Sequence, residues 1–131
     1  MKVEVQHVDG MRFLATAENR AVVVDATPED GGGGTALSAP QLFVAALGAC
    51  ICEFIANSCR LHDTPFERLE VEVSCEELER PRRLGPIDVQ VRLEPQPSES
   101  MQRRLLGVTK RATLISTLAQ APEVNVRFFV G

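Results

Sequence analysis

The chain has 131 residues, of which 44% are hydrophobic and 24% charged, and its formal net charge is −4. This balance is typical of a globular domain of about 100–150 residues, so we predict a single domain over residues 1–131. No basic stripe accompanies the negative charge, which argues against nucleic-acid binding. The N-terminus is charged where a signal peptide is apolar, and the four cysteines lack disulfide-framework spacing. We therefore expect a cytoplasmic protein with reduced thiols and no membrane contact.

Three short strands are predicted in the first quarter of the chain. Apolar and polar residues alternate over residues 3–8 and again over 11–17, with a turn signal between them, which predicts a hairpin. A third strand is predicted over residues 20–25. Residues 28–35 contain four consecutive glycines and predict a mobile loop. The glycine run lacks the Gly-Lys-Ser/Thr ending of a phosphate-binding loop, so we favour a simple connection.

The stretch from Ser38 to His62 predicts one long core helix. Ser38 and Gln41 have the spacing of a capping box, and Pro65 ends the helical pattern. Residues 42–52 contain no charged side chain, so this part of the helix is expected to be buried on all sides. The apolar run is too short to cross a bilayer, which takes about 20 residues.

The second half of the chain predicts a hairpin, a helix and a strand. Apolar residues alternate with acidic or polar ones over residues 69–76 and 87–94, which predicts two antiparallel strands. Apolar residues then recur at helical spacing between Ser98 and Pro122, and a last strand is predicted over 124–130. The order βββ-α-ββ-α-β gives an α+β fold with a mainly antiparallel sheet and two long helices.

The spacing of the histidines and cysteines predicts no metal site and no local redox pair. His7 and His62 are far apart in sequence and lack a partner at ligand spacing. On a helix, Cys50 and Cys52 point about 200° apart, and Cys52 and Cys59 are about 10 Å apart, beyond disulfide reach. Free cysteine is also a common buried residue, so each of these thiols has a purely structural interpretation. We expect no cofactor.

Residues 38–50, with the sequence SAPQLFVAALGAC, resemble the central-helix motif of the osmotically inducible protein C and organic hydroperoxide resistance (OsmC/Ohr) superfamily. The order of elements is also similar. The resemblance implies an OsmC-like fold and an intertwined homodimer with the two central helices at its centre. It further implies a thiol peroxidase, in which Cys50 attacks an organic hydroperoxide and becomes a sulfenic acid. A cysteine on the second long helix then forms a disulfide with it, an arginine and a glutamate assist, and a dithiol is the reductant.

The chain departs from the pattern of this superfamily in three places. Ala112 stands where the resolving cysteine is expected, and Pro40 and Gln41 stand where the glutamate is expected. Arg20 is the nearest match to the arginine, although a turn-flanking surface charge is the simpler interpretation of this residue. The capping role of Gln41 is likewise sufficient to explain it.

Two functional hypotheses follow from these residues. In the first, Cys50 is the single nucleophile of an OsmC-like protein that is at most a weak thiol peroxidase. In the second, a non-catalytic homodimer binds a small apolar ligand in its interface cleft, and Cys50 only packs the core. Whether Cys52 or Cys75 replaces the missing resolving thiol stays open. We predict weak or absent turnover, and we expect Ala112 to face the central helix rather than solvent.

Overall fold

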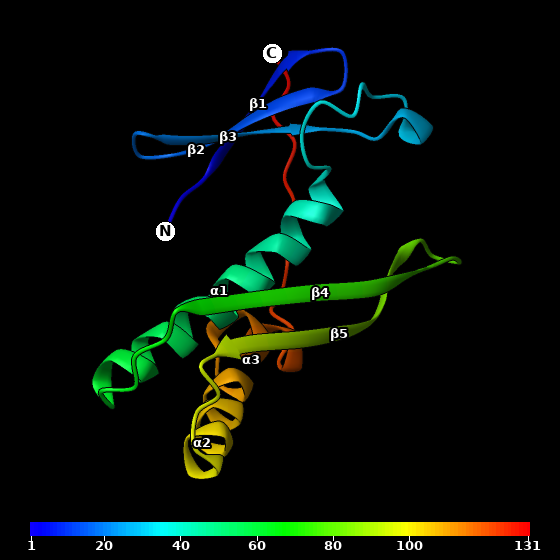
Figure 1. Ribbon diagram of the computed structural model, residues 1–131. Helices are drawn as coiled ribbons and strands as arrows, with labels where there is room; N and C mark the ends of the chain where they lie inside the picture. Colours follow the sequence, from blue (N-terminus) through cyan, green and yellow to red (C-terminus); the bar gives the residue numbers. More distant parts are fainter. The chain divides into compact units, whose positions relative to one another are not determined.

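The computed structural model describes residues 1–131, which form two compact units. The first unit contains Met1–Ala46 and Val73–Asp88, and the second contains Leu47–Glu72 and Val89–Gly131. Three strands precede the long helix α1, and a two-stranded hairpin and two shorter helices follow it (Figure 1). The predicted α+β class is confirmed, with the β-strands divided between two separate antiparallel sheets.

The first sheet has three antiparallel strands in the order β1-β2-β3. They are β1 (Glu4–Asp9), β2 (Arg12–Ala17) and β3 (Arg20–Asp25), close to the bounds that the alternating pattern predicts. His7 lies opposite Phe13, and their rings meet edge to face with centroids 5.5 Å apart. This aromatic pair stabilises the β1–β2 register.

The glycine run after β3 has a defined conformation. A short 3-10 turn, η1 (Pro28–Asp30), leads into it, and Gly31 and Gly34 have φ angles of 91° and 64°. Glycine adopts this left-handed region without steric cost. The buried carboxylate of Asp25 accepts hydrogen bonds from the backbone and the hydroxyl of Thr35. The loop that the sequence predicts as mobile is therefore anchored to the end of β3.

The long helix α1 (Ala39–Leu61) confirms the predicted central helix. Its capping box forms as expected, because the Ser38 N–H donates to Gln41 Oε1 at 2.9 Å and the Gln41 N–H donates to Ser38 Oγ at 3.3 Å. The prediction that the start of this helix is buried on all sides is wrong for the isolated chain, since Phe43 is exposed. One chain covers one side of the helix, whose buried residues are Leu47, Gly48, Cys50, Ile51, Ile55, Ser58 and Cys59.

By length and composition α1 is also able to cross a membrane. The core helix of a protein outside a membrane passes the same test, so this is weak evidence. Polar residues interrupt its second half, where Arg60 donates to the side chain of Asn57 at 2.6 Å. An exposed polar face of this kind is typical of a helix that packs on one side and meets water on the other.

The second sheet is the hairpin of β4 (Arg68–Leu78) and β5 (Arg83–Glu94). Both strands are longer than the predicted ranges 69–76 and 87–94, because regular pairing continues toward the turn. Burial alternates along β4, with the apolar residues half-buried and the acidic ones exposed. This is the pattern of a strand with one covered face.

The predicted second long helix is instead two helices, α2 (Glu99–Lys110) and α3 (Thr113–Ala119). Its start is as expected, because the Met101 N–H donates to Ser98 Oγ at 3.2 Å and caps α2. The division was not predicted, because the apolar spacing between Ser98 and Pro122 continues through it.

The break between α2 and α3 lies at Ala112. Its ψ angle of 141° is extended, while the N–H groups of Arg111 and Ala112 bond to the carbonyls of Val108 and Thr109, three residues back. The Thr109 hydroxyl also donates to the Leu106 carbonyl at 2.7 Å. Hydrogen bonds that span three residues tighten the last turn of a helix, and β-branched residues have a low helix propensity. Local backbone preference therefore outweighs the apolar periodicity here.

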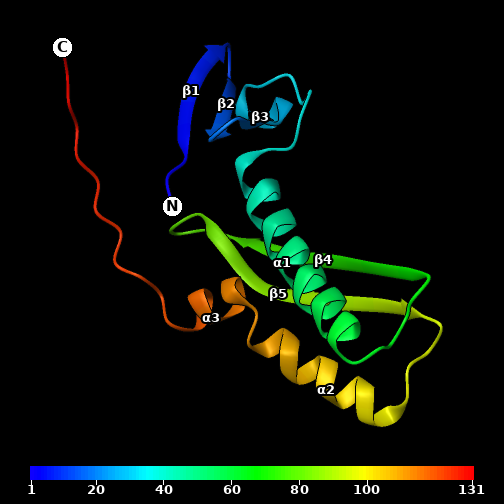
Figure 2. The same cartoon turned by 90° about the vertical axis from the view of Figure 1, so that its left-hand side faces the viewer.

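The predicted last strand over residues 124–130 is wrong for the isolated chain. The segment after α3 has no secondary structure and runs as an extended trace to the C-terminus (Figure 2). Its apolar side chains, Val124, Val126, Phe128, Phe129 and Val130, are 76–93% exposed. Alternating residues form a strand only beside a neighbouring strand, and this segment has none within the chain.

Candidate functional site

Cys50 lies on the buried side of α1, twelve residues into the helix, and its exposed fraction is 8%. Leu47 and Ile51, one turn before it and directly after it, are almost fully buried. The helix dipole acts within the first turn, so it does not assist this thiol. The position is that of a shielded thiol with a small opening to solvent.

Arg20, the weak candidate for the assisting cation, begins β3 in the first unit. Its side chain is 80% exposed, and its guanidinium lies 3.5 Å from the carboxylate of Glu18. An exposed pair of this kind contributes about 0–1 kcal/mol. The exposure of Arg20 and its pairing with Glu18 agree with the simpler interpretation of this residue as a surface charge beside a turn.

The position of the expected glutamate carries no carboxylate. Pro40 and Gln41 occupy the first turn of α1, and no acidic residue is found in that turn. The Gln41 side chain accepts the Ser38 N–H, so it is already used for capping. This part of the site therefore supplies no general base.

The position of the expected resolving cysteine is also apolar. Ala112 has an exposed fraction of 0%, which confirms that it lies away from solvent. The four cysteines form no disulfide. Burial raises the pKa of the Cys52 thiol, with a smaller contribution from Glu53, and burial also raises the pKa of Cys59. Because the thiolate is the reactive form, neither of these thiols is activated at neutral pH.

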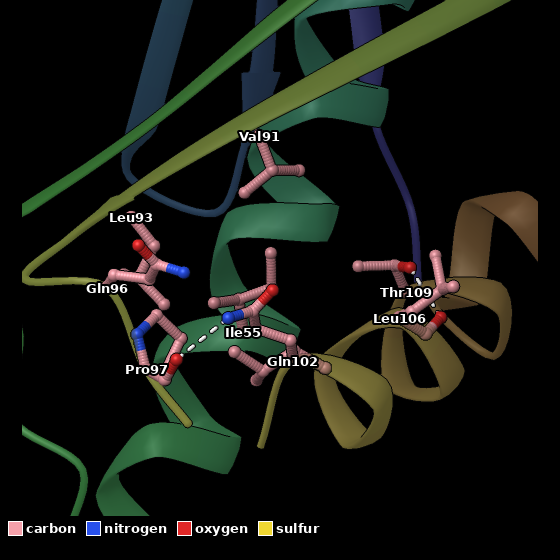
Figure 3. A pocket seen from close by; sticks show the side chains of 9 residues that line it. Ile55, Val91, Leu93, Gln96, Pro97, Gln102, Leu106 and Thr109 are labelled. Atoms are coloured by element: carbon pink, nitrogen blue, oxygen red, sulfur yellow. Dashed lines mark hydrogen bonds between the residues drawn. The ribbon is translucent and has the colours of Figure 1, made fainter. Parts of the chain in front are cut away.

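An apolar hollow of about 310 Å³ lies within the second unit. Figure 3 shows side chains from α1, β5 and α2 converging on it. Gln102 donates to the Pro97 carbonyl at 2.8 Å at its rim. This volume is in the range of small-molecule sites. The lining residues are Ile55, Val91, Leu93, Gln96, Pro97, Gln102, Leu105, Leu106 and Thr109. Sequence reasoning missed this hollow, because α1 lies far in sequence from β5, α2 and the loop that joins them.

The chain is thus an α+β protein in which a three-stranded meander precedes a long helix with three of the four cysteines, and a hairpin follows it. A family model described as OsmC-like protein matches residues 31–127. The chain therefore belongs to the OsmC-like family, as the sequence motif predicts.

Solved structures with the same fold include three from different bacteria. A proposed osmotic stress induced and detoxification response protein from Psychrobacter arcticus 273-4 has a TM-score of 0.84 and 18% identity, over 89% of this chain and 87% of that chain. An OsmC like protein from Mycoplasma pneumoniae has a TM-score of 0.76 and 16% identity, over 92% and 89%.

The third is an organic hydroperoxide resistance protein, OsmC, from Legionella pneumophila, with a TM-score of 0.68 and 15% identity, over 90% of this chain and 89% of that chain. At these identities the similarity establishes the fold. Among curated proteins, none matches the chain with statistical significance.

Proposed function

We propose that Cys50 is the single nucleophile of a slow thiol peroxidase that reduces organic hydroperoxides. The observation that carries this proposal is the place of Cys50 on the central helix of an OsmC-like chain, nearly buried but with 8% exposure. The thiolate sulfur attacks the outer hydroperoxide oxygen and the O–O bond breaks. The alkoxide takes a proton and leaves as an alcohol, while Cys50 becomes a sulfenic acid.

The return of Cys50 to the thiol requires an external reductant, because Ala112 supplies no second sulfur. One thiol of an added dithiol condenses with the sulfenic acid, which releases water and forms a mixed disulfide. Its second thiol then attacks that bond, which frees Cys50 and leaves the reductant as a disulfide. Because this return depends on an external thiol and not on a second cysteine of the chain, we expect turnover to be slow.

We propose also that the functional form is a homodimer. Exposed apolar residues lie on β1, on β3, at Phe43 near the start of α1 and, in greatest number, on the C-terminal segment that contains Phe128 and Phe129. Large exposed apolar side chains that cluster on single elements are typical of association surfaces. A second copy would cover the uncovered side of α1 and provide a neighbour for the C-terminal segment.

The alternative function is the binding of a small apolar ligand without catalysis. The apolar hollow beside Ile55 and Leu105 supports this alternative. Its walls are aliphatic, and the amides of Gln96 and Gln102 at its edge are suited to orient one polar group of a ligand. In this case Cys50 is a packing residue.

The two functions are separated by a peroxidase assay with cumene hydroperoxide and dithiothreitol. Slow turnover that Cys50→Ser abolishes and Cys75→Ser leaves intact is expected. A sulfenic-acid probe is expected to label Cys50 in the wild-type protein. If neither turnover nor labelling is seen, the peroxidase proposal is wrong and the ligand-binding function is favoured.

A further inference from the structure

A second hollow in the same unit, of about 270 Å³, has a different character. It is formed by the last two turns of α1 and by α2, and we call it the basic hollow. Its lining is apolar and basic apart from two neutral polar residues, Asn57 and Ser58, and includes no acidic residue. The apolar ones are Phe54, Leu61 and Val108, and the basic ones are His62, Arg104 and Arg111.

The two arginines of the basic hollow have no partner. Neither Arg104 nor Arg111 takes part in a side-chain hydrogen bond or an ion pair, while Arg82 is held by both carboxylate oxygens of Asp30 at 3.1 and 2.9 Å. Arg104 lies on α2 and Arg111 directly follows its last residue, two helical turns further on, which places the two on one side of the helix about 10 Å apart. In a chain of net charge −4, two free guanidiniums at one hollow make a local site for an anion.

The helix ends limit which anion fits the basic hollow. α1 ends at Leu61 and α2 at Lys110, and the carbonyl ends of helices carry partial negative charge. The His62 ring forms a hydrogen bond of 2.9 Å with the Ser58 carbonyl, so one of its nitrogens already satisfies a carbonyl at the end of α1. A hydrated dianion such as phosphate meets these carbonyl ends and gains nothing from the apolar walls. A monoanion with a hydrocarbon body uses both the charges and the walls.

We propose that the basic hollow binds a medium-chain organic carboxylate. Its carboxylate lies on Arg104 and Arg111, whose planar guanidiniums match the two oxygens. Its hydrocarbon chain lies against Phe54, Leu61 and Val108. The site is independent of Cys50 and is kept if the peroxidase proposal fails.

The test is a titration of the full-length, ¹⁵N-labelled protein with octanoate, followed by NMR. Saturable shifts at Arg104, Arg111 and His62 are expected. The double variant Arg104→Gln/Arg111→Gln is expected to weaken binding about tenfold or more, because charge-assisted hydrogen bonds are lost. The matched control is Arg103→Gln, which removes one exposed arginine of α2 outside the hollow and is expected to change the affinity less than about twofold.

Octan-1-ol and inorganic phosphate complete the test. Octanoate binding more tightly than both supports the proposal. The proposal is overturned if octan-1-ol binds as tightly as octanoate or if phosphate binds more tightly. It is also overturned if Arg103→Gln weakens octanoate binding as much as the double variant does, or if octanoate causes no saturable shifts. If the double variant fails to fold, the two single variants replace it, and unchanged affinity in both overturns the proposal.

Discussion

The carboxylate of Asp25 accepts a hydrogen bond of 2.6 Å from the hydroxyl of Thr35, which joins the end of β3 to the end of the glycine run. The N–H groups of Thr35 and Gly33 donate to the same carboxylate at 3.0 and 3.3 Å. Asp25 is only 1% exposed, so these donors replace the water that burial removes. The Thr35 hydroxyl, followed by its N–H, lowers the pKa of Asp25 from its ordinary value of 3.8, against the opposing effect of desolvation.

Asp25→Asn is expected to lower the melting temperature by several degrees, because an amide cannot accept three donors at the same atoms. The folded-state pKa of Asp25 lies below 3.8, so its contribution to stability is complete above that value and is lost as the pH falls through the folded pKa. Thermal unfolding at about pH 7, 5 and 3 checks this expectation.

The difference between the wild-type protein and Asp25→Asn should persist to about pH 5 and narrow toward pH 3. Asp30→Asn is the control, since Asp30 forms an exposed pair with Arg82. A difference that stays constant to about pH 3 contradicts the role assigned to the Asp25 carboxylate.

Local signals in the sequence were sufficient for the elements that depend on neighbouring residues. The Ser38–Gln41 capping box and the bounds of β3 follow from short-range chemistry, and both are confirmed. The break at Ala112 escaped prediction, because apolar spacing reports which face is buried and not whether the backbone continues as a helix. The predicted strand over 124–130 failed because a strand needs a partner that the alternation does not supply.

The candidate site was predictable only in part. The motif identified the place of Cys50 in the central helix, and the burial of Ala112 agrees with the predicted apolar stripe. The two hollows of the second unit were not predictable, because in each of them residues of α1 meet residues from a much later part of the chain. The anchoring role of Asp25 was also missed, since its donors are eight and ten residues away.

If the protein is a homodimer, light scattering at micromolar concentration is expected to give twice the chain mass of 14.3 kDa. Phe43→Asp is expected to shift the protein toward monomer, because it places a charge on the apolar start of α1. Ser116→Asp, at an exposed position of α3, is the matched control. A wild-type protein that is a stable monomer at this concentration refutes the assembly.

The C-terminal segment provides a separate test of assembly. Deletion of residues 121–131 removes the exposed Val124, Val126 and Phe128. If a second copy pairs with this segment, the deletion is expected to weaken the dimer at least about tenfold, as the loss of several buried apolar side chains implies. Sedimentation equilibrium measures the change. An unaltered dissociation constant shows that the segment is not part of the interface.

Ala112→Cys tests whether the missing second thiol limits turnover. If Cys50 is the nucleophile, one equivalent of cumene hydroperoxide is expected to produce a disulfide between positions 50 and 112, with turnover raised about tenfold or more as intramolecular attack replaces an external thiol. The added sulfur at a fully buried site is expected to cost about 1–3 kcal/mol of stability. Ala119→Cys, at an exposed position of α3, is the control. Mass spectrometry that finds no such disulfide contradicts the assigned place of position 112 in the site.

Leu106→Glu tests the apolar hollow as a ligand site. Leu106 lines the hollow but is itself exposed, so the variant is expected to fold. The neutral fluorescent probe N-phenyl-1-naphthylamine should bind the wild-type protein, and the variant should bind it about tenfold more weakly, because the new carboxylate is desolvated by an apolar ligand. Leu118→Glu, on α3 and outside the hollow, should bind the probe as the wild-type protein does. Cys50→Ser should also leave probe binding unchanged, which separates the hollow from the thiol. Equal loss of affinity in Leu106→Glu and Leu118→Glu would show that the probe reports general surface hydrophobicity, and would contradict the assignment of the hollow as a ligand site.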